Sequence, residues 1–210
     1  MKTVKMTLLA TTMSFFFAMN SYALPTADDE VTLTDSFGSV NGGEFNVFVN
    51  DSTEVNYISF CLEKHEYVSM GTPYTISSVA DYAENGGEGA VDDKDYVSDA
   101  TKWVFWNYLF KGTFGDRSEE LANNVQNTIW FLEEEITLAE MGDASATWYS
   151  TNVAVVTDYT ISGTVKVLNL KDDNGIYKQS QLIGEVPEPS TMLLFGTGLA
   201  GLASFARRKR

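Results

Sequence analysis

Two short apolar segments, one near each end of the chain, limit what the sequence can fold into. The first covers residues 6–19 behind Lys2 and Lys5, and the second covers residues 191–206. Apolar runs flanked by basic residues are typical of export and membrane signals, which are not part of a folded core. The remaining residues, 24–186, have the length of one ordinary domain.

The N-terminal segment has the order of a secretory signal peptide. Basic residues precede the apolar run, and Ser21 and Ala23 place small residues where signal peptidase cuts. We expect cleavage between Ala23 and Leu24, which removes residues 1–23. The alternative is an uncleaved membrane anchor, although the apolar run is short for a membrane span.

The C-terminal segment combines three features in a fixed order. Pro187, Glu188 and Pro189 come first, and a glycine-containing apolar run of 16 residues follows. A basic cluster then ends the sequence: Arg207, Arg208, Lys209 and Arg210. Basic residues favour the cytoplasmic side of a membrane. The run therefore predicts a single hydrophobic helix that leaves residues 24–186 on the outer side of the membrane.

This order resembles the PEP-CTERM protein-sorting tail of Gram-negative bacteria. The resemblance covers residues 187–210. It implies recognition by an exosortase, a membrane protease that cleaves near the Pro-Glu-Pro triplet. It also implies transient anchoring in the inner membrane and release to the cell surface or the extracellular (biofilm) matrix. A simple C-terminal anchor is the alternative, and it would still give a surface protein.

The stretch between the two signals is strongly acidic. All 29 acidic residues lie between residues 28 and 188 together with only eight basic residues, which gives this stretch a formal net charge of −21. Phosphate binding needs a basic surface, so DNA and RNA are excluded as partners. Anionic lipid headgroups are disfavoured for the same reason.

The single cysteine and the single histidine exclude several kinds of site. Cys61 has no partner for a disulfide within the chain, and Cys61 with His65 gives too few ligands for zinc. A Ser-His-Asp triad would need His65, and the sequence has no G-x-S-x-G segment. Acidic turns at residues 92–95 and 172–175 offer oxygen ligands but lack EF-hand spacing. We therefore expect no metal site and no cofactor.

The body, residues 24–186, shows strand patterns at both ends and helical patterns between them. Segments rich in β-branched or alternating residues predict strands at residues 31–37, 44–50, 55–63, 73–78, within 152–170, and 176–185. Capping residues and apolar periodicity predict helices at residues 98–111 and 118–135, and glycine and acidic residues predict a loop at 84–95. The predicted fold class is α+β, mainly β. It is a β-sandwich or barrel with an inserted helical segment at about 98–135, followed by the C-terminal hydrophobic helix.

Cys61 lies in the third predicted strand. Side-chain alternation places it on the more polar face, with His65, and places Phe60 on the opposite face, where a core cysteine would be expected. Gln126 lies at the edge of the apolar stripe of the second predicted helix, one turn before Trp130. A glutamine in such a place is usually solvated. Cys61 and Gln126 can meet if that helix packs across the sheet.

The segments Ser-Phe-Cys-Leu-Glu at 59–63 and Val-Gln-Asn-Thr-Ile-Trp at 125–130 resemble the two motif blocks of thioester domains in bacterial surface adhesins. In that family the cysteine thiol attacks the glutamine carboxamide and ammonia leaves. The resulting internal thioester reacts with amines or hydroxyls of a target. The resemblance therefore implies a bond between Cys61 and Gln126, and a polysaccharide or protein target of unidentified structure.

A thioester hydrolyses in water and needs a pocket that excludes it. The candidate apolar walls of this pocket are Trp103, Trp106 and Trp130. His65 is a candidate general base; the alternative is that it is an exposed histidine at the end of the strand. We expect an adhesion or matrix protein that is no enzyme beyond forming its own thioester. The alternatives are a passive structural protein of the matrix with an inert Cys61 and, more weakly supported, a polysaccharide-active enzyme.

Overall fold

The computed structural model describes residues 24–39, 42–84 and 90–186. The predicted signal peptide, the Pro187-Glu188-Pro189 triplet, the C-terminal hydrophobic helix and the basic cluster lie outside the described residues. None of the helices within the described ranges is long and apolar enough to cross a membrane.

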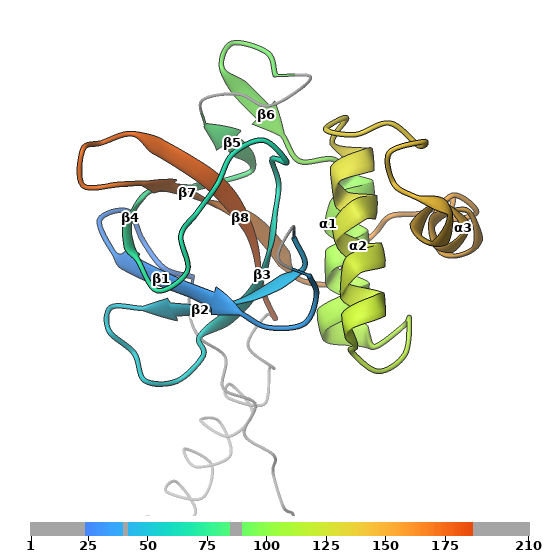
Figure 1. Ribbon diagram of the computed structural model, residues 1–210, viewed down its shortest axis with the longest axis horizontal. Coiled ribbons are helices and arrows are strands. Elements are labelled where there is room, and N and C mark those ends of the chain that lie inside the picture. Colours follow the sequence, from blue (N-terminus) through green and yellow to red (C-terminus); the bar gives the residue numbers. More distant parts are fainter. Residues whose placement is uncertain (1–23, 40–41, 85–89, 187–210) are drawn as a thin grey trace, which may run out of the picture.

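Among the described residues, six antiparallel strands close into a barrel in the order β1-β2-β3-β8-β7-β4 (Figure 1). The strands are β1 (Glu30–Asp35), β2 (Glu44–Val49), β3 (Tyr57–Cys61), β4 (Pro73–Ala80), β7 (Thr164–Lys171) and β8 (Tyr177–Glu185). Closure pairs both edges of the sheet and so removes exposed edge strands. The prediction of a mainly β fold is confirmed. Of the two predicted architectures, sandwich and barrel, the protein adopts the barrel.

The strand register decides which side chains face the barrel interior. Residues opposite each other in an antiparallel pair share a face, and Cys61 lies opposite Gln181 whereas Phe60 lies opposite Leu182. Cys61 belongs to the interior cluster, which includes Leu33, Val47, Ile76, Leu168 and Leu170. Phe60 belongs to the outer cluster, which the helices cover.

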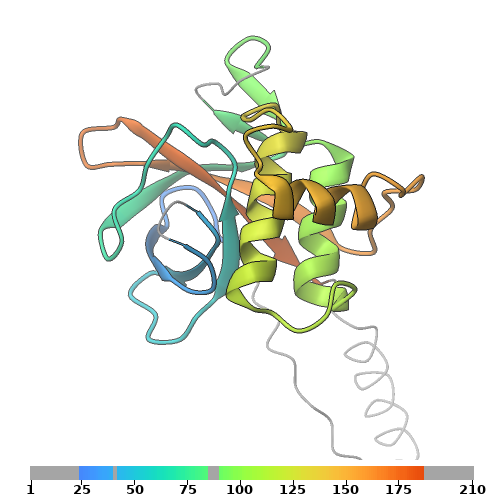
Figure 2. The same cartoon turned by 45° about the vertical axis from the view of Figure 1, so that its right-hand side comes forward.

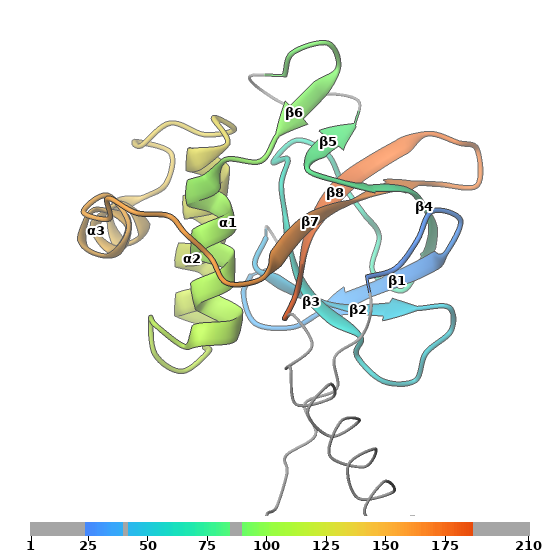
Figure 3. The ribbon, with the colours of Figure 1, turned by 180° about the vertical axis from the view of Figure 1, so that it is seen from behind.

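In the part of the chain that the structure describes, three α-helices and one turn of π-helix lie on one side of the barrel (Figures 2 and 3). They are α1 (Asp99–Trp106), the π-helical turn η1 (Asn107–Lys111), α2 (Glu119–Leu132) and α3 (Asp143–Asn152). Ser98 and Ser118 cap α1 and α2 by accepting backbone N–H groups of Thr101 and Leu121. Helices α1 and α2 lie next to the barrel, and α3 packs against α2 on the far side.

Two elements differ from the sequence prediction. Residues 143–152 form α3, and the strand expected within 152–170 begins only at Thr164. The predicted loop at 84–95 is flanked by a small hairpin of β5 (Tyr82–Glu84) and β6 (Lys94–Tyr96). Ser145 is the one buried residue of α3, so the sequence of this helix shows no apolar stripe. Such a stripe is the pattern by which helices are recognised, and α3 was therefore not predicted.

Candidate functional site

Cys61 is the last residue of β3, and its side chain is buried, with 1% of the residue exposed. Cys61 shares the more polar face of β3 with Ser59, as alternation predicted, but this face looks into the barrel. The expectation that a core cysteine would lie with Phe60 is therefore wrong. One face of β3 looks into the barrel and the other is covered by helices, so both faces are buried. Ser59 and Glu63, which carry the polarity of the predicted face, are buried as well.

Gln126 projects from α2 onto the main chain of Cys61. Its Nε2 donates a hydrogen bond to the carbonyl oxygen of Cys61 at 2.9 Å, and its Oε1 accepts the N–H of Cys61 at 3.1 Å. A second backbone N–H, that of Gly43, reaches the same Oε1 at 3.4 Å. Gln126 is 1% exposed, so it is not the solvated glutamine that is usual at the edge of a helix stripe.

The segment leading into β2 covers this carboxamide. A Cβ placed on Gly42 would lie 2.5 Å from Cη2 of Trp130 and 2.9 Å from Cγ of Gln126. Gly42 also has a φ of 140°, which other residues rarely adopt. A glycine is therefore needed here, and its backbone, together with Trp130, shields the Gln126 side chain from water.

The Cys61 sulfur has a polar partner within the barrel. Nε2 of Gln181 lies 3.7 Å from Sγ, and Oε1 of Gln181 accepts the hydroxyl of Ser59 at 3.0 Å. Burial raises the pKa of the Cys61 thiol far above its ordinary value; the Gln181 contact opposes this and the charge of Glu63 adds to it. The thiol is therefore protonated at neutral pH.

Gln181 and Gly43 were not singled out in the sequence. The segment Gln179-Ser180-Gln181 inside an otherwise apolar strand was a usable signal, because buried polar side chains need partners. The Gly42-Gly43 pair lies between the first two predicted strands and is typical of a turn, but nothing local indicates that the Gly43 N–H reaches a helix far along the chain.

Glu44, the residue after Gly43, is the centre of a buried ionic cluster. Its carboxylate accepts hydrogen bonds from the guanidinium of Arg117, from the hydroxyl of Tyr108 at 2.7 Å, and from the hydroxyl of Ser36. Burial alone would raise the pKa of Glu44, but the hydrogen bonds from Arg117, Ser36 and Tyr108 hold it below its ordinary value. This cluster fixes the start of β2 against the segment from η1 to α2.

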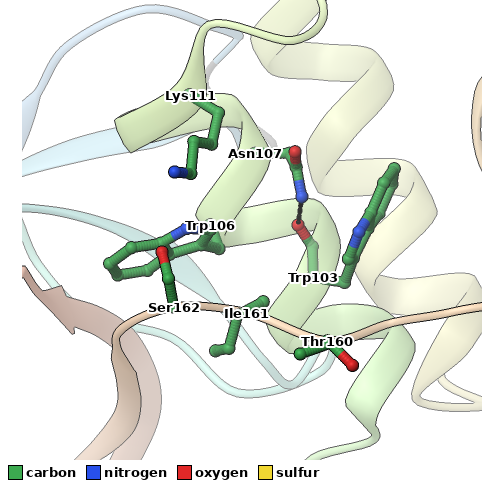
Figure 4. Close-up of a pocket in the computed structure, with 7 residues that line it drawn as sticks. All are labelled: Trp103, Trp106, Asn107, Lys111, Thr160, Ile161 and Ser162. Carbon is green, nitrogen blue, oxygen red and sulfur yellow. Dashed lines mark hydrogen bonds between the residues drawn. The ribbon is translucent and has the colours of Figure 1, made fainter.

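The other predicted wall residues lie elsewhere. Trp103 and Trp106 line a separate cavity of about 270 Å³ (Figure 4). The rest of its lining comes from η1 and from the segment before β7: Asn107, Lys111, Thr160, Ile161 and Ser162. Both tryptophans pack in the outer cluster, and of the three predicted walls only Trp130 shares the interior cluster with Cys61.

His65 is exposed and lies beyond the end of β3. The strand alternation that placed it beside Cys61 therefore does not extend to this position. The described residues contain no group of three or more His, Cys, Asp or Glu side chains that could hold a metal ion.

No curated protein and no solved structure matches this chain. Residues 185–210 match the PEP-CTERM protein-sorting motif. The match contains Pro187, Glu188 and Pro189 as well as the terminal basic cluster, and it confirms the sorting tail that the sequence predicted. The chain therefore carries the tail of an exosortase-sorted protein that is exported to the cell envelope or surface.

Proposed function

We propose that this is a surface-displayed adhesion or matrix protein that attaches covalently to its target through an internal thioester between Cys61 and Gln126. The observation that carries the proposal is the double hydrogen bond between the Gln126 carboxamide and the main chain of Cys61. A glutamine side chain and the residue that bears the only thiol of the chain are thus held together in a buried place.

The surroundings suit a bond that water would destroy. Both residues are 1% exposed, and the backbone of Gly42 lies close to the Gln126 side chain and to the Trp130 ring. A chain with a single cysteine has no second thiol to attack the thioester by exchange. The bond forms without a cofactor, and each molecule reacts once with an amine or hydroxyl of a protein or polysaccharide. In this proposal the protein binds its target covalently and does not turn over a substrate as an enzyme does.

A passive structural protein is the second candidate, and the burial of Cys61 favours it. A protonated, fully buried thiol is a poor nucleophile, and the Gln126 carboxamide has its hydrogen bonds satisfied without any covalent chemistry. In that case Cys61 is an inert core residue.

The mass of the intact body distinguishes the two candidates. We expect the wild-type protein to be lighter than its sequence by one ammonia. Methylamine should add to Gln126 and free a titratable thiol at Cys61. The variants Cys61→Ala and Gln126→Ala should both show their full sequence mass and form no adduct. A wild-type protein with full mass and no adduct, even after brief exposure to mild denaturant, would favour the passive structural protein.

The sorting tail gives an independent prediction. A plain membrane anchor needs only apolar length and flanking charge, whereas a recognised signal needs its own side chains. Changing Pro187, Glu188 and Pro189 to alanine should leave uncleaved protein in the membrane fraction. Val155→Ala, an exposed position outside the matched residues 185–210, serves as the control and should be processed normally. Normal processing of the triple variant would contradict exosortase recognition of the triplet.

A further inference from the structure

We infer that the backbone N–H groups of Gly43 and Cys61 form an oxyanion hole for the chemistry at Gln126, an inference that rests on the thioester proposed above. Both groups already donate to Oε1 of Gln126, at 3.4 Å from Gly43 and 3.1 Å from Cys61. An acyl-transfer site needs two donors that converge on the one oxygen where negative charge develops.

The reaction assigns a role to each atom of the carboxamide. A sulfur electron pair of Cys61 attacks Cδ of Gln126, and the carbonyl π pair moves to Oε1, where the two N–H groups meet it. As the C=O bond re-forms, the C–N bond breaks and its electron pair leaves on Nε2. That nitrogen takes the thiol proton and departs as ammonia. The products, a thioester and one ammonia, balance the starting thiol and carboxamide.

The leaving nitrogen is held by the same main chain. Nε2 of Gln126 donates to the carbonyl oxygen of Cys61 at 2.9 Å, which fixes the plane of the carboxamide beside the attacking residue. The site is buried, so hydrogen bonds to a developing charge are stronger there than in water. This stabilisation offsets part of the cost of using a thiol whose ionisation is disfavoured.

The Gly43 donor is held in position through the residue that follows it. Glu44 is anchored by Arg117 and Tyr108, and its own N–H donates to the carbonyl of Phe37 at 2.7 Å. Gly43 has a φ of 128°, and a Cβ there would lie 2.7 Å from the Phe37 carbonyl oxygen. An alanine at this position must therefore shift the backbone and move the N–H away from Gln126.

The same donors act when the target arrives. In the thioester the former Oε1 is the carbonyl oxygen, and an attacking amine or hydroxyl drives negative charge onto it again. The oxyanion hole therefore accelerates both formation of the thioester and its reaction with the target.

The test compares Gly43→Ala with Gly71→Ala in the full body. Gly71 also has a positive φ, 73°, but a Cβ there would meet nothing within 4 Å, so Gly71→Ala places an alanine in the left-handed region without touching the site. Formation is followed after refolding by the loss of ammonia in the intact mass, and reactivity by the rate of methylamine addition. Gly43→Ala should slow both by at least about tenfold, because losing an oxyanion-hole donor costs roughly 10²–10³-fold in rate. Gly71→Ala should stay within about twofold of wild type, since it leaves the donors in place.

A spectroscopic measurement on the wild-type protein does not depend on how the variants fold. With the Gln126 side-chain carbonyl labelled with carbon-13, its thioester stretch should lie at lower frequency than that of a small thioester with the same label in water. A wild-type protein that never loses ammonia would overturn both the thioester and the oxyanion hole. A wild-type thioester with an unshifted stretch, or a Gly43→Ala variant as fast as Gly71→Ala, would overturn the oxyanion hole alone.

Discussion

Replacing Glu44 with alanine is expected to lower the free energy of unfolding by about 3–5 kcal/mol, the range typical for breaking a buried ion pair. The Glu44 side chain is fully buried, and it receives hydrogen bonds from Arg117, Tyr108 and Ser36. Its removal leaves a guanidinium and a phenol hydroxyl that have lost their acceptor. Because the Arg117 side chain is 37% exposed, water can reach it, and the lower end of the range is expected.

Urea denaturation of the body measures this effect. Glu30→Ala is the matched control, because Glu30 begins a barrel strand as Glu44 does but is exposed; its substitution should change the free energy of unfolding by no more than about 0.5 kcal/mol. The double variant with Arg117→Ala should lose less than the sum of the two single variants, since the two residues act as a pair. A loss below about 1 kcal/mol for Glu44→Ala would show that the cluster does not stabilise the start of β2.

Local patterns predicted most of the secondary structure but could not choose the architecture. Strands followed from alternation, and α1 and α2 followed from the capping residues Ser98 and Ser118. Closure into a barrel depends on the pairing of β1 with β4 and of β3 with β8, which are distant in sequence. No turn or local motif records such pairings, so a sandwich and a barrel were equally consistent with the sequence.

The same limit explains why the sequence did not show that the more polar face of β3, which carries Cys61, is buried. Alternation distinguishes a buried face from an exposed face only where one side of a strand meets water. In β3 the interior face carries Ser59 and Cys61 and is polar because Gln181 supplies partners across the barrel. Polarity on this strand therefore reflects internal hydrogen bonding, which no single segment of sequence reveals.

The three tryptophans also could not be placed from the sequence. Trp103, Trp106 and Trp130 all lie in predicted helices, and their apolar character gave no indication of which cluster each would join. The helix faces decide this. Trp130 follows Gln126 by one turn and meets the barrel end, whereas Trp103 and Trp106 face the outer cluster and the segment before β7.

Glu63 is a carboxyl group buried close to Cys61, and its ionisation is expected to make the stability of the fold depend on pH. It is 2% exposed, and one oxygen, Oε2, accepts the N–H of Ser180 at 2.7 Å. The other oxygen, Oε1, has no hydrogen-bond partner among the described residues. Burial raises the pKa of Glu63 to about 8, with a further increase from the charge of Glu66, while the Ser180 N–H opposes the shift.

A raised pKa makes the stability of the fold fall as the pH increases. In the unfolded chain Glu63 ionises near its ordinary pKa of 4.5, whereas in the folded protein it keeps its proton until about pH 8. Between these values the folded state binds the extra proton, so the free energy of unfolding decreases with rising pH. At about 1.4 kcal/mol for each pKa unit, the decrease approaches roughly 5 kcal/mol by pH 8 and then levels off.

Glu63→Gln removes this dependence, because an amide of the same shape stays neutral and still offers an oxygen to the Ser180 N–H. Denaturation from pH 5 to pH 9 should show the wild type losing stability relative to the variant, which becomes the more stable protein at pH 9. Asp95 has a pKa raised to about 7 by partial burial and by the charges of Glu133, Glu135 and Glu134, so it titrates in the same range. The Asp95→Asn variant is therefore measured over the same pH range. Its effect on the free energy of unfolding should be smaller than that of Glu63→Gln, and the two effects should add. Parallel stability curves for wild type and Glu63→Gln would mean that Glu63 ionises within the folded barrel, and that its carboxylate charge acts directly on the Cys61 thiol.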